Sequence, residues 1–374
     1  TITLPSSAES GDQIVLIDFA RTWGTNKIII DSNGLNYQGN DDTYTVEYNT
    51  DGQSLNIVYS DATKGWLPLE DDVTALEPVA PPTQKAIFGY GYNASGGGRL
   101  SMSNLVNSSG VVAADVTGVG TARMTIAATS YGGDKAIFGY GDSGSATNLS
   151  NLVSSSGVIA SDTTGVGTAR YAPAAASYDG DKGIFGYGDT GGDSYVSLTN
   201  LVNNFGVIAT DTTGVGTARR YLAATGYGSS GQAVFAYGST GSRLSMKNLV
   251  SNSGVVASDA TGVGSARNNL AAVKYGTDKA IFGYGSTGSI TGVTNLVSNV
   301  GVIASDVSGV GTARQYLAAA SYGGDKALFG YGNTASGAVS MTNLVSNIGV
   351  VGADVTGVGS ARETLGAAGY STSA

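Results

Sequence analysis

The residue types that carry most acid–base and metal chemistry in proteins are missing from this chain. Its 374 residues include no histidine and no cysteine. Without histidine the chain lacks the commonest general base and metal ligand, and a Ser-His-Asp triad is excluded. Without cysteine it has no disulfide, thiolate metal site or cysteine nucleophile. The composition therefore favours a binding or structural protein, and we expect no catalytic residue, no metal site and no cofactor.

Paired carboxylates are the remaining route to catalysis, as in the cleavage of glycosidic bonds. Residues 85–374 contain one glutamate, Glu363, and most of their aspartates recur at fixed positions of a repeat. The aspartates outside that pattern are Asp142, Asp179, Asp189 and Asp193. Asp189 and Asp193 form the one conceivable catalytic pair, so a polysaccharide-cleaving enzyme is the weakest functional hypothesis.

Aspartate and arginine also recur together, once in each repeat. We expect them to be structural pairs or turn-capping groups, because equal occurrence in every repeat suits a scaffold and a functional site usually breaks a repeat. A ring of ligand-binding charges is the alternative. The expected pairs are Asp115 with Arg123, Asp162 with Arg170, Asp211 with Arg219, Asp259 with Arg267, and Asp306 with Arg314.

Each of these arginines ends a glycine-rich segment such as Gly118-Val-Gly-Thr-Ala-Arg123. Glycine-rich loops bind phosphates when they lie between a strand and the N-terminus of a helix. No helix is expected after these segments. We therefore interpret them as turns between repeated units.

The repeats are the strongest structural signal in the chain. The segment Lys85-Ala-Ile-Phe-Gly-Tyr-Gly91 recurs from residues 135, 182, 232, 279 and 326, at spacings of 47 or 50 residues. Asn-Leu-Val and Gly-Val-Ile/Val segments recur between these copies. A period of this length with four short strand-like pieces is typical of a β-propeller blade. We therefore predict an all-β chain with a six-bladed β-propeller over residues 85–374.

Alternation along the Phe-Gly-Tyr-Gly segment predicts two different faces of a strand. Ala86, Phe88 and Tyr90 should form a bulky face, and Ile87 with the glycines a flatter one that lets a neighbouring ring approach. Segments such as Tyr131 to Lys135 have the glycine and Asp content of a tight turn joining this strand to the preceding one.

The two ends of the repeat array are complementary. The first unit lacks the strand that precedes Phe-Gly-Tyr-Gly elsewhere, and the last unit ends with a spare copy, from Arg362 to Tyr370. We expect this C-terminal strand to complete the first blade and close the ring, which removes exposed strand edges.

The order Arg, Ala-Ala, Tyr, Phe-Gly-Tyr-Gly, variable loop and Asp-terminated strand resembles kelch repeats. The sequence departs from that family by lacking the double glycine after the second strand and the tryptophan near the repeat end. The resemblance covers residues 85–374 and implies architecture only.

Loops between the Phe-Gly-Tyr-Gly and Asn-Leu-Val strands differ in length and chemistry from repeat to repeat. They should cluster at one end of the propeller, where binding surfaces often lie. Aromatic and arginine side chains dominate binding hot spots. The candidate ligand-binding residues are therefore Tyr92, Arg99, Tyr195 and Arg243, with tolerant solvated loop tips as the alternative.

Residues 1–67 lie outside the repeat and predict a small all-β domain, with strands near residues 13–18, 27–31, 44–48 and 54–59. The isoleucines at 28–30 suggest a strand buried on both sides. Residues 68–84 form a proline-rich connector. Residues 1–84 hold 13 acidic and 3 basic side chains, a balance of −10, and the remainder holds 15 and 16. Neither part has the basic surface that nucleic-acid binding needs, and no apolar run suggests membrane insertion.

Segments Gly11 to Phe19, Asn49 to Gly52 and Tyr59 to Trp66 resemble small β-domains of bacteriophage tail fibres and other virion appendages. That resemblance implies a non-enzymatic structural protein on the virion surface. It also implies homo-oligomers, with a trimer favoured, assembled through the N-terminal domain, and contacts with other virion proteins. The propeller would serve adhesion or decoration, with host surface glycan as a ligand. A free secreted or cell-surface lectin is the alternative.

Overall fold

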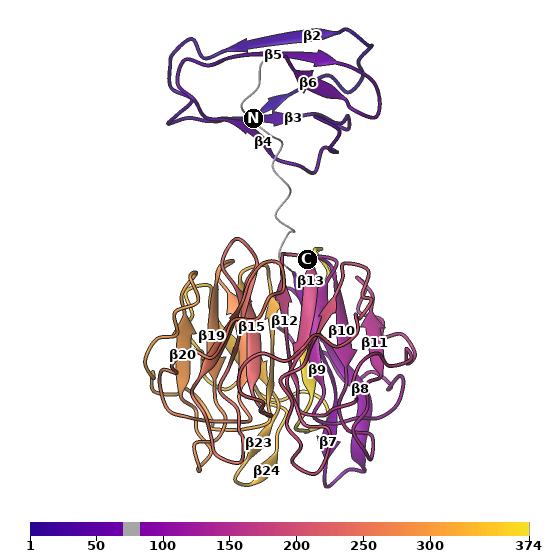
Figure 1. Ribbon diagram of the computed structural model, residues 1–374, viewed down its shortest axis with the longest axis vertical. Coiled ribbons are helices and arrows are strands. Elements are labelled where there is room, and N and C mark those ends of the chain that lie inside the picture. The colour runs from indigo at the N-terminus through magenta and orange to yellow at the C-terminus, as the bar shows by residue number, and fades with distance from the viewer. Residues whose placement is uncertain (70–82, 374) are drawn as a thin grey trace. The chain divides into compact units, whose positions relative to one another are not determined.

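The computed structural model describes residues 1–69 and 83–373, and these are strands and loops without a helix (Figure 1). No helix in this described part is long and apolar enough to cross a membrane. The chain divides into two compact units, unit 1 (residues 1–79) and unit 2 (residues 80–374). Most of the predicted connector 68–84 lies outside the described residues. Its first residue is not a connector, because Pro68 pairs with Ile57 at the end of a unit 1 sheet.

Unit 1 consists of two three-stranded sheets, ordered β1-β3-β4 and β2-β5-β6. The strands are β1 (Ile2–Thr3), β2 (Gln13–Ile17), β3 (Ile28–Asp31), β4 (Val46–Tyr48), β5 (Ser54–Tyr59) and β6 (Trp66–Pro68). Trp23, Trp66 and Tyr48 lie in the core between them. The isoleucine run is only partly as expected, since Ile30 is buried while Ile28 and Ile29 are half-buried within this chain.

Unit 2 contains six three-stranded antiparallel sheets that repeat one topology. In chain order, sheet 1 is β26 (Gly366–Tyr370), β7 (Lys85–Asn93) and β8 (Gly98–Val106), and sheet 2 is β9 (Ala127–Tyr131), β10 (Lys135–Gly139) and β11 (Ser150–Val153). Sheet 3 is β12 (Ala174–Tyr178), β13 (Lys182–Gly186) and β14 (Thr199–Val202), and sheet 4 is β15 (Ala223–Tyr227), β16 (Gln232–Ala236) and β17 (Lys247–Val250). Sheet 5 is β18 (Ala271–Tyr275), β19 (Lys279–Gly283) and β20 (Thr294–Val297), and sheet 6 is β21 (Ala318–Tyr322), β22 (Lys326–Gly330) and β25 (Thr342–Val345). A small hairpin, β23 (Asn333–Thr334) and β24 (Gly337–Ala338), follows β22.

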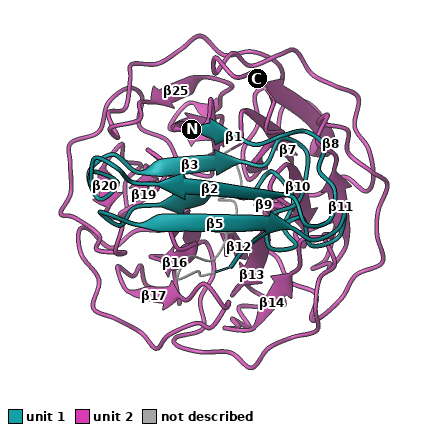
Figure 2. Ribbon diagram, turned by 90° about the horizontal axis from the view of Figure 1, so that it is seen from above, with its two compact units in different colours: residues 1–79 teal, residues 80–374 magenta. Residues whose placement is uncertain are grey.

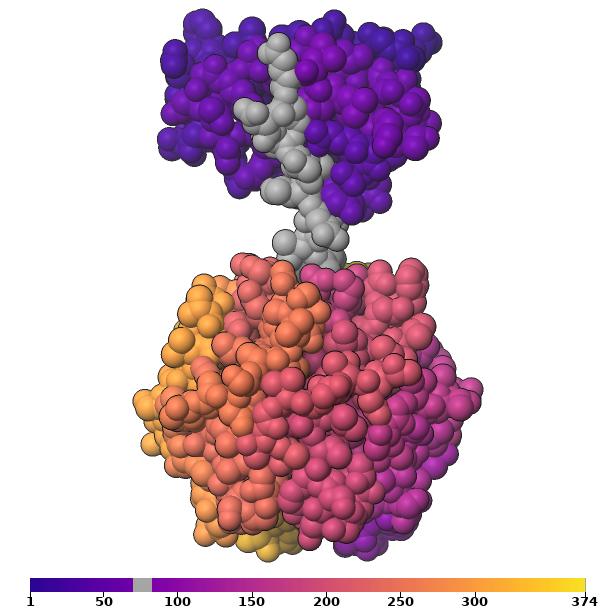
Figure 3. Space-filling view, viewed as in Figure 1, coloured from indigo at the N-terminus to yellow at the C-terminus, as the bar shows by residue number. Residues whose placement is uncertain are grey.

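The first strands of the six sheets contact one another in a cycle that returns to its start, β9-β12-β15-β18-β21-β26-β9. Figure 2 shows the sheets of unit 2 around a common centre. In the space-filling view, successive repeats follow one another along the outside of unit 2, as the change from magenta to orange shows (Figure 3). The predicted role of the C-terminal strand in sheet 1 is confirmed, because β26 pairs with β7 from Gly366 opposite Gly89 to Tyr370 opposite Lys85.

The predicted alternation of the Phe-Gly-Tyr-Gly strand is wrong at its tyrosine. Phe88 packs against Tyr331 of sheet 6, whereas Tyr90 packs against Phe138 of sheet 2, so the two rings lie on opposite faces. The reason is the backbone, since all six tyrosines at this position have left-handed φ angles of 60–66°. Such a residue breaks the two-residue period of a strand.

The glycine face behaves as predicted. The ring of Phe138 covers Gly89, where a Cβ atom would lie 2.7 Å from its Cζ. The same contact joins Phe185 to Gly139 and recurs around unit 2, except that Ala236 takes the glycine position in sheet 4. Each phenylalanine also meets the preceding sheet's tyrosine, with ring centroids 5.0–5.3 Å apart. Aromatic packing therefore joins every sheet to the next.

Candidate functional site

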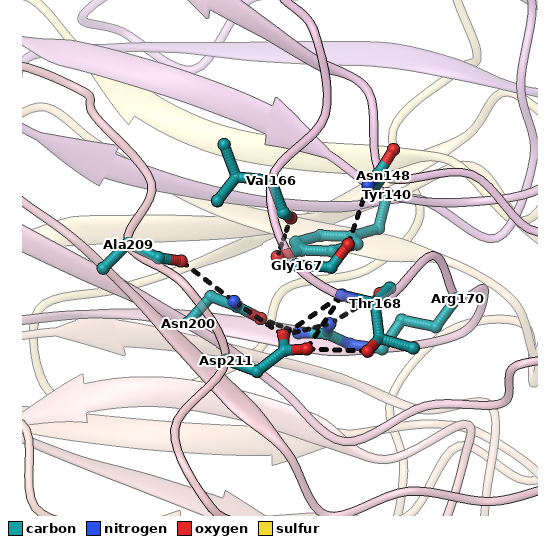
Figure 4. Close-up of polar contacts among 9 residues, drawn as sticks. All are labelled: Tyr140, Asn148, Val166, Gly167, Thr168, Arg170, Asn200, Ala209 and Asp211. Carbon is teal, nitrogen blue, oxygen red and sulfur yellow. Dashed lines mark hydrogen bonds and ion pairs between the residues drawn. The ribbon is translucent and has the colours of Figure 1, made fainter.

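A repeated polar cluster holds the end of each sheet, and sheet 3 shows its parts (Figure 4). Thr168 lies just before the first strand and donates both its backbone N–H (3.0 Å) and its hydroxyl (2.6 Å) to Asp211, which follows the third strand. Asn200 of that third strand donates from Nδ2 to the same carboxylate at 2.9 Å. Arg170 in turn donates to the Asn200 side-chain oxygen at 2.7 Å. The cluster ties the start of the first strand to the exit from the third.

The expected Asp–Arg pairs are wrong in partner, although both residue types belong to the cluster. Asp211 lies 4.0 Å from Arg170 and not beside Arg219, which faces Asp259. The chain leaves one sheet at the aspartate and enters the next sheet at the following arginine, so neighbours in sequence belong to different sheets. Within the repeated cluster the ion pairs are Arg170–Asp211, Arg219–Asp259, Arg267–Asp306, Arg314–Asp354 and Arg362–Asp115, and the charge of Arg123 acts on Asp162.

The glycine-rich loops do bind an anion, but the anion is a carboxylate of the chain itself. Gly167 has a left-handed φ of 74°, and a side chain there would overlap the carboxylate of Asp211. Burial alone would raise the pKa of Asp211, yet the hydrogen bonds from Thr168 and Asn200 and the charge of Arg170 outweigh it. The pKa of Asp211 is therefore lowered, and the carboxylate remains ionised as part of the scaffold.

Each buried arginine also lies over a tyrosine of the preceding sheet. The Arg170 guanidinium carbon is 4.0 Å from the centroid of the Tyr140 ring, and the six such distances range up to 4.8 Å. Burial raises the pKa of Tyr140 to about 12, although Arg170 opposes the shift. These cation–π contacts join neighbouring sheets at buried positions. Arginine and aspartate thus take part in contacts within and between the sheets.

The centre of unit 2 is closed at one end by a ring of backbone hydrogen bonds. Ala172 donates its N–H to the Thr125 oxygen (2.9 Å), and Tyr221 donates to the Ala172 oxygen (3.2 Å). The series continues until Thr125 donates to the Thr364 oxygen at 2.8 Å. All six members have left-handed φ angles of 49–57°. We call them the axial ring: Thr125, Ala172, Tyr221, Asn269, Tyr316 and Thr364. The end of unit 2 where they lie is the ring end.

The axial ring has one backbone conformation and four kinds of side chain. The residue just before each ring member varies even more, and none is repeated: Met124, Tyr171, Arg220, Asn268, Gln315 and Glu363. Each of these pairs through its backbone with the residue that follows a Tyr-Gly segment: Asp142, Asp189, Ser239, Ser286, Asn333 and Tyr92. The ring end therefore carries varied side chains on a repeated backbone.

Arg220 organises the most elaborate cluster of the ring end. Its guanidinium donates to Asp189 at 2.6 Å and to Asp193 at 2.8 Å. Tyr171 donates its hydroxyl to the buried Asp189 carboxylate at 3.0 Å. The guanidinium carbon also lies 5.1 Å from the centroid of the Tyr195 ring. Asp189 and Asp193 thus share one arginine as their ion-pair partner.

The four predicted ligand-binding residues lie at the ring end, in or beside the segment that joins the second and third strands of a sheet, but they differ in their surroundings. Tyr195 belongs to the Arg220 cluster, and its hydroxyl donates to Asp193 at 3.1 Å. Arg243 approaches Ser286 Oγ at 3.5 Å. Arg99 forms an ion pair with Asp142 at 3.0 Å. Tyr92 exchanges backbone hydrogen bonds with Glu363.

Sequence reasoning missed the residues nearest the centre, namely Tyr171, Arg220, Tyr221, Asn269 and Tyr316. The signal was present in the repeats, because the two positions after each repeated arginine vary in polarity and charge, while the arginine is the same in all six repeats and the third position is always apolar. Sequence reasoning also missed the ion pair between Arg362 and Asp115, because these two residues lie at opposite ends of the repeat array.

The ring end offers aromatic rings, amides, ion pairs and a shallow axial pocket, a set suited to binding a polar ligand. Among the described residues no group of three or more acidic side chains could hold a metal ion. Comparison with models of known protein families and with curated proteins gave no match. The functional argument therefore depends on the chain itself.

Proposed function

We propose that unit 2 is a six-bladed, kelch-like β-propeller and that the chain is a non-enzymatic structural protein of a bacteriophage appendage or fibre. In this proposal the propeller is displayed on the virion surface for adhesion or decoration, and its ring end contacts host surface glycan. The appendage assignment rests on the resemblance of the N-terminal segments to tail-fibre domains.

Three features support the propeller. The six sheets repeat one topology, and their first strands contact one another in a closed cycle. The hydrogen bonds of the axial ring also return to their start. The pairing of β26 with β7 joins the last repeat to the first, as a propeller that closes with its C-terminal strand requires.

One observation carries the adhesion proposal, and it is the contrast between conserved and varied positions inside the repeats. The Arg, Asp, Asn and Tyr positions that hold the sheets are the same in all six repeats. The positions at the ring end keep their backbone geometry but change their side chains. A purely architectural ring would not need a different residue before each of its six members. Variation on a fixed scaffold is how loops are adapted to ligands.

Unit 1 supports assembly through its edge strand β2. Val15, Ile17 and the following Phe19 are 55%, 65% and 96% exposed, respectively. β2 pairs only with β5 and lacks charge from Gln13 to Ile17, although unit 1 is strongly acidic. An apolar, uncharged edge strand is a surface for pairing with another chain. We propose that copies of this chain cover the strand, with a trimer favoured.

Light scattering after size exclusion tests the assembly, on the full chain and on residues 83–374. We expect an oligomer for the full chain and a monomer for the shorter one. Ile17→Lys should shift the full chain to monomers, and Val58→Lys on the adjacent strand serves as a comparison. A monomeric full chain would remove the main support for an appendage.

Adhesion is tested separately, by sedimenting the full chain with cells or cell envelopes of candidate bacterial hosts. The alternative, a free lectin, is favoured if the chain is monomeric and still binds glycan. An enzyme that cleaves surface polysaccharide would release reducing ends, and that release would be lost in Asp189→Asn or Asp193→Asn.

A further inference from the structure

A small pocket opens at the centre of the ring end, and every repeat contributes to it. The pocket has a volume of about 80 Å³. Its rim is the axial ring, and its walls are the apolar residues that follow the ring members: Ile126, Pro173, Leu222, Leu270, Leu317 and Leu365. Liquid water occupies about 30 Å³ per molecule, so the pocket has room for two or three waters. A whole sugar ring is too large, but a substituent of about four heavy atoms fits.

One polar atom in this pocket lacks a partner. Asn269 is only 9% exposed, and its Nδ2 donates to the side-chain oxygen of Gln315 at 3.3 Å. Its Oδ1 is buried and has no hydrogen bond in the described part of the chain. The backbone N–H of Asn269 is already used in the axial ring. A buried acceptor without a donor is unfavourable, so this oxygen is suited to receive an N–H or O–H from a ligand.

The rim of the pocket carries aromatic side chains on one side and small side chains on the other. Tyr221 and Tyr316 meet edge to face with centroids 5.9 Å apart, while Thr125, Ala172 and Thr364 leave the opposite side low. The hydroxyls of both threonines donate to the oxygens of the residues before them, so they do not compete for Asn269. A ligand is thus directed into the pocket beside a tyrosine wall.

We propose, on the basis of the glycan-binding function above, that the pocket receives the acetamido group of an N-acetylated hexosamine at the end of a surface glycan. The acetamido methyl group matches the apolar walls, and its N–H donates to Asn269 Oδ1. The sugar ring remains outside, against Tyr316 or Tyr221, and exposed residues of the ring end reach its hydroxyls. The group has four heavy atoms, which agrees with the size of the pocket. A neutral hexose has neither the methyl group nor the amide N–H.

The test uses the full chain and isothermal titration with N-acetylglucosamine and N-acetylgalactosamine oligosaccharides, with the de-N-acetylated and plain hexose forms as comparisons. Saturation-transfer NMR reports which ligand protons lie closest to the protein. We expect the acetamido methyl protons to receive the strongest transfer and removal of the acetyl group to weaken binding at least tenfold.

Asn269→Ala should weaken binding at least tenfold, and Asn269→Asp, which keeps an acceptor, should retain it. The alanine variant is expected to fold, because Ala172 holds the equivalent position with φ 51° against 57° for Asn269. Asn252→Ala, in an exposed loop away from the axial ring, is the matched control.

Sedimentation of the same variants with host cell envelopes separates this inference from the function on which it rests. Envelope binding that is unaffected by Asn269→Ala and by de-N-acetylation would overturn the pocket proposal and leave adhesion standing. Absence of envelope binding by the unaltered chain, together with tight binding of N-acetylated oligosaccharides, would support the pocket and count against adhesion as the function.

Discussion

Ser360 donates its backbone N–H and its hydroxyl, at 3.0 and 2.6 Å, to the carboxylate of Asp115, a residue 245 positions earlier in the chain. The same contact occurs in the other sheets between residues 41–43 positions apart. One local geometry therefore serves both to complete a sheet and to join the two ends of unit 2. The contribution of this contact to stability should therefore differ between Asp115, which joins the chain ends, and the equivalent aspartates of the other sheets.

Replacement of the cluster aspartate should destabilise unit 2 in every sheet. Asp211→Ala removes hydrogen bonds from Thr168 and Asn200 and leaves Arg170 buried without its carboxylate. We expect a loss of about 2–3 kcal/mol in the free energy of unfolding, measured by urea denaturation. Lys182→Ala, which removes an exposed ion pair with Asp179 and leaves the left-handed backbone of Asp179 unchanged, is the control and should change stability by about 0.5 kcal/mol or less. Equal stability of the two variants would contradict a structural role for the cluster.

Asp115→Ala should have an additional effect that Asp211→Ala lacks. It loosens the junction between the chain ends, so we expect the unit 2 strands β26 and β7 to exchange amide hydrogens faster before the rest of unit 2 unfolds. Hydrogen exchange followed by mass spectrometry distinguishes the two variants. Uniform acceleration in all sheets for both variants would show that the junction has no special weakness.

Removal of the C-terminal strand should open unit 2. Deletion of residues 360–374 removes β26, exposes an edge of β7 and deprives Asp115 of its partner. Open strand edges promote association between chains, so we expect aggregates by light scattering and a broad melting transition. Deletion of residues 373–374 alone leaves β26 in place and should melt as the full chain does. A monodisperse 360–374 deletion with unchanged melting would show that β26 is dispensable.

An added methyl group should strain the packing of phenylalanine on glycine, although sheet 4 accommodates Ala236 at this position, where the Tyr–Phe ring separation is the widest of the six at 5.3 Å. A Cβ atom at Gly139 would lie 2.8 Å from Phe185 Cζ, and we expect Gly139→Ala to cost about 1–3 kcal/mol by overpacking. Gly352→Ala is the matched control, because its nearest neighbour would be 3.4 Å away and the other repeats carry alanine there. Thermal melting of the two variants checks the prediction, and equal melting temperatures would contradict it.

The buried tyrosines predict a sharp alkaline transition. Burial raises the pKa of Tyr90, Tyr140, Tyr187 and Tyr284 to about 12. The unfolded chain loses these protons near pH 10 and the folded chain near pH 12, so stability is intact below pH 10 and falls as the pH rises toward 12. Each pKa unit of difference between the folded and unfolded chain corresponds to about 1.4 kcal/mol in the free energy of unfolding per tyrosine.

Phenolate absorbance and circular dichroism, recorded together, test this transition. We expect exposed tyrosines to titrate near pH 10, and the buried group to ionise at higher pH together with the loss of β structure. Complete ionisation near pH 10 with the circular dichroism unchanged would mean that these hydroxyls are accessible in the folded chain.

Several elements were predictable because their causes are local. The repeat spacing predicts the strand from Lys85 and the turn between Tyr131 and Lys135. The unequal ends of the array predict the pairing of β26 with β7. The orientation of Tyr90 was not predictable in this way. Its left-handed backbone is imposed by neighbours, since Arg123 and Phe138 of the next sheet hold its ring.

The sequence by itself determined the all-β class, the period of the repeat and the scaffold role of its arginines and aspartates, because these depend on composition and spacing along the chain. Only the tertiary structure decided that Asp115 faces Arg362, that six residues join in the axial ring, and that Asn269 lines a central pocket with an oxygen that is unpaired among the described residues. Those relationships join residues from different sheets. They arise when closure of unit 2 brings distant segments to a common centre, and no local pattern records which residues will meet there.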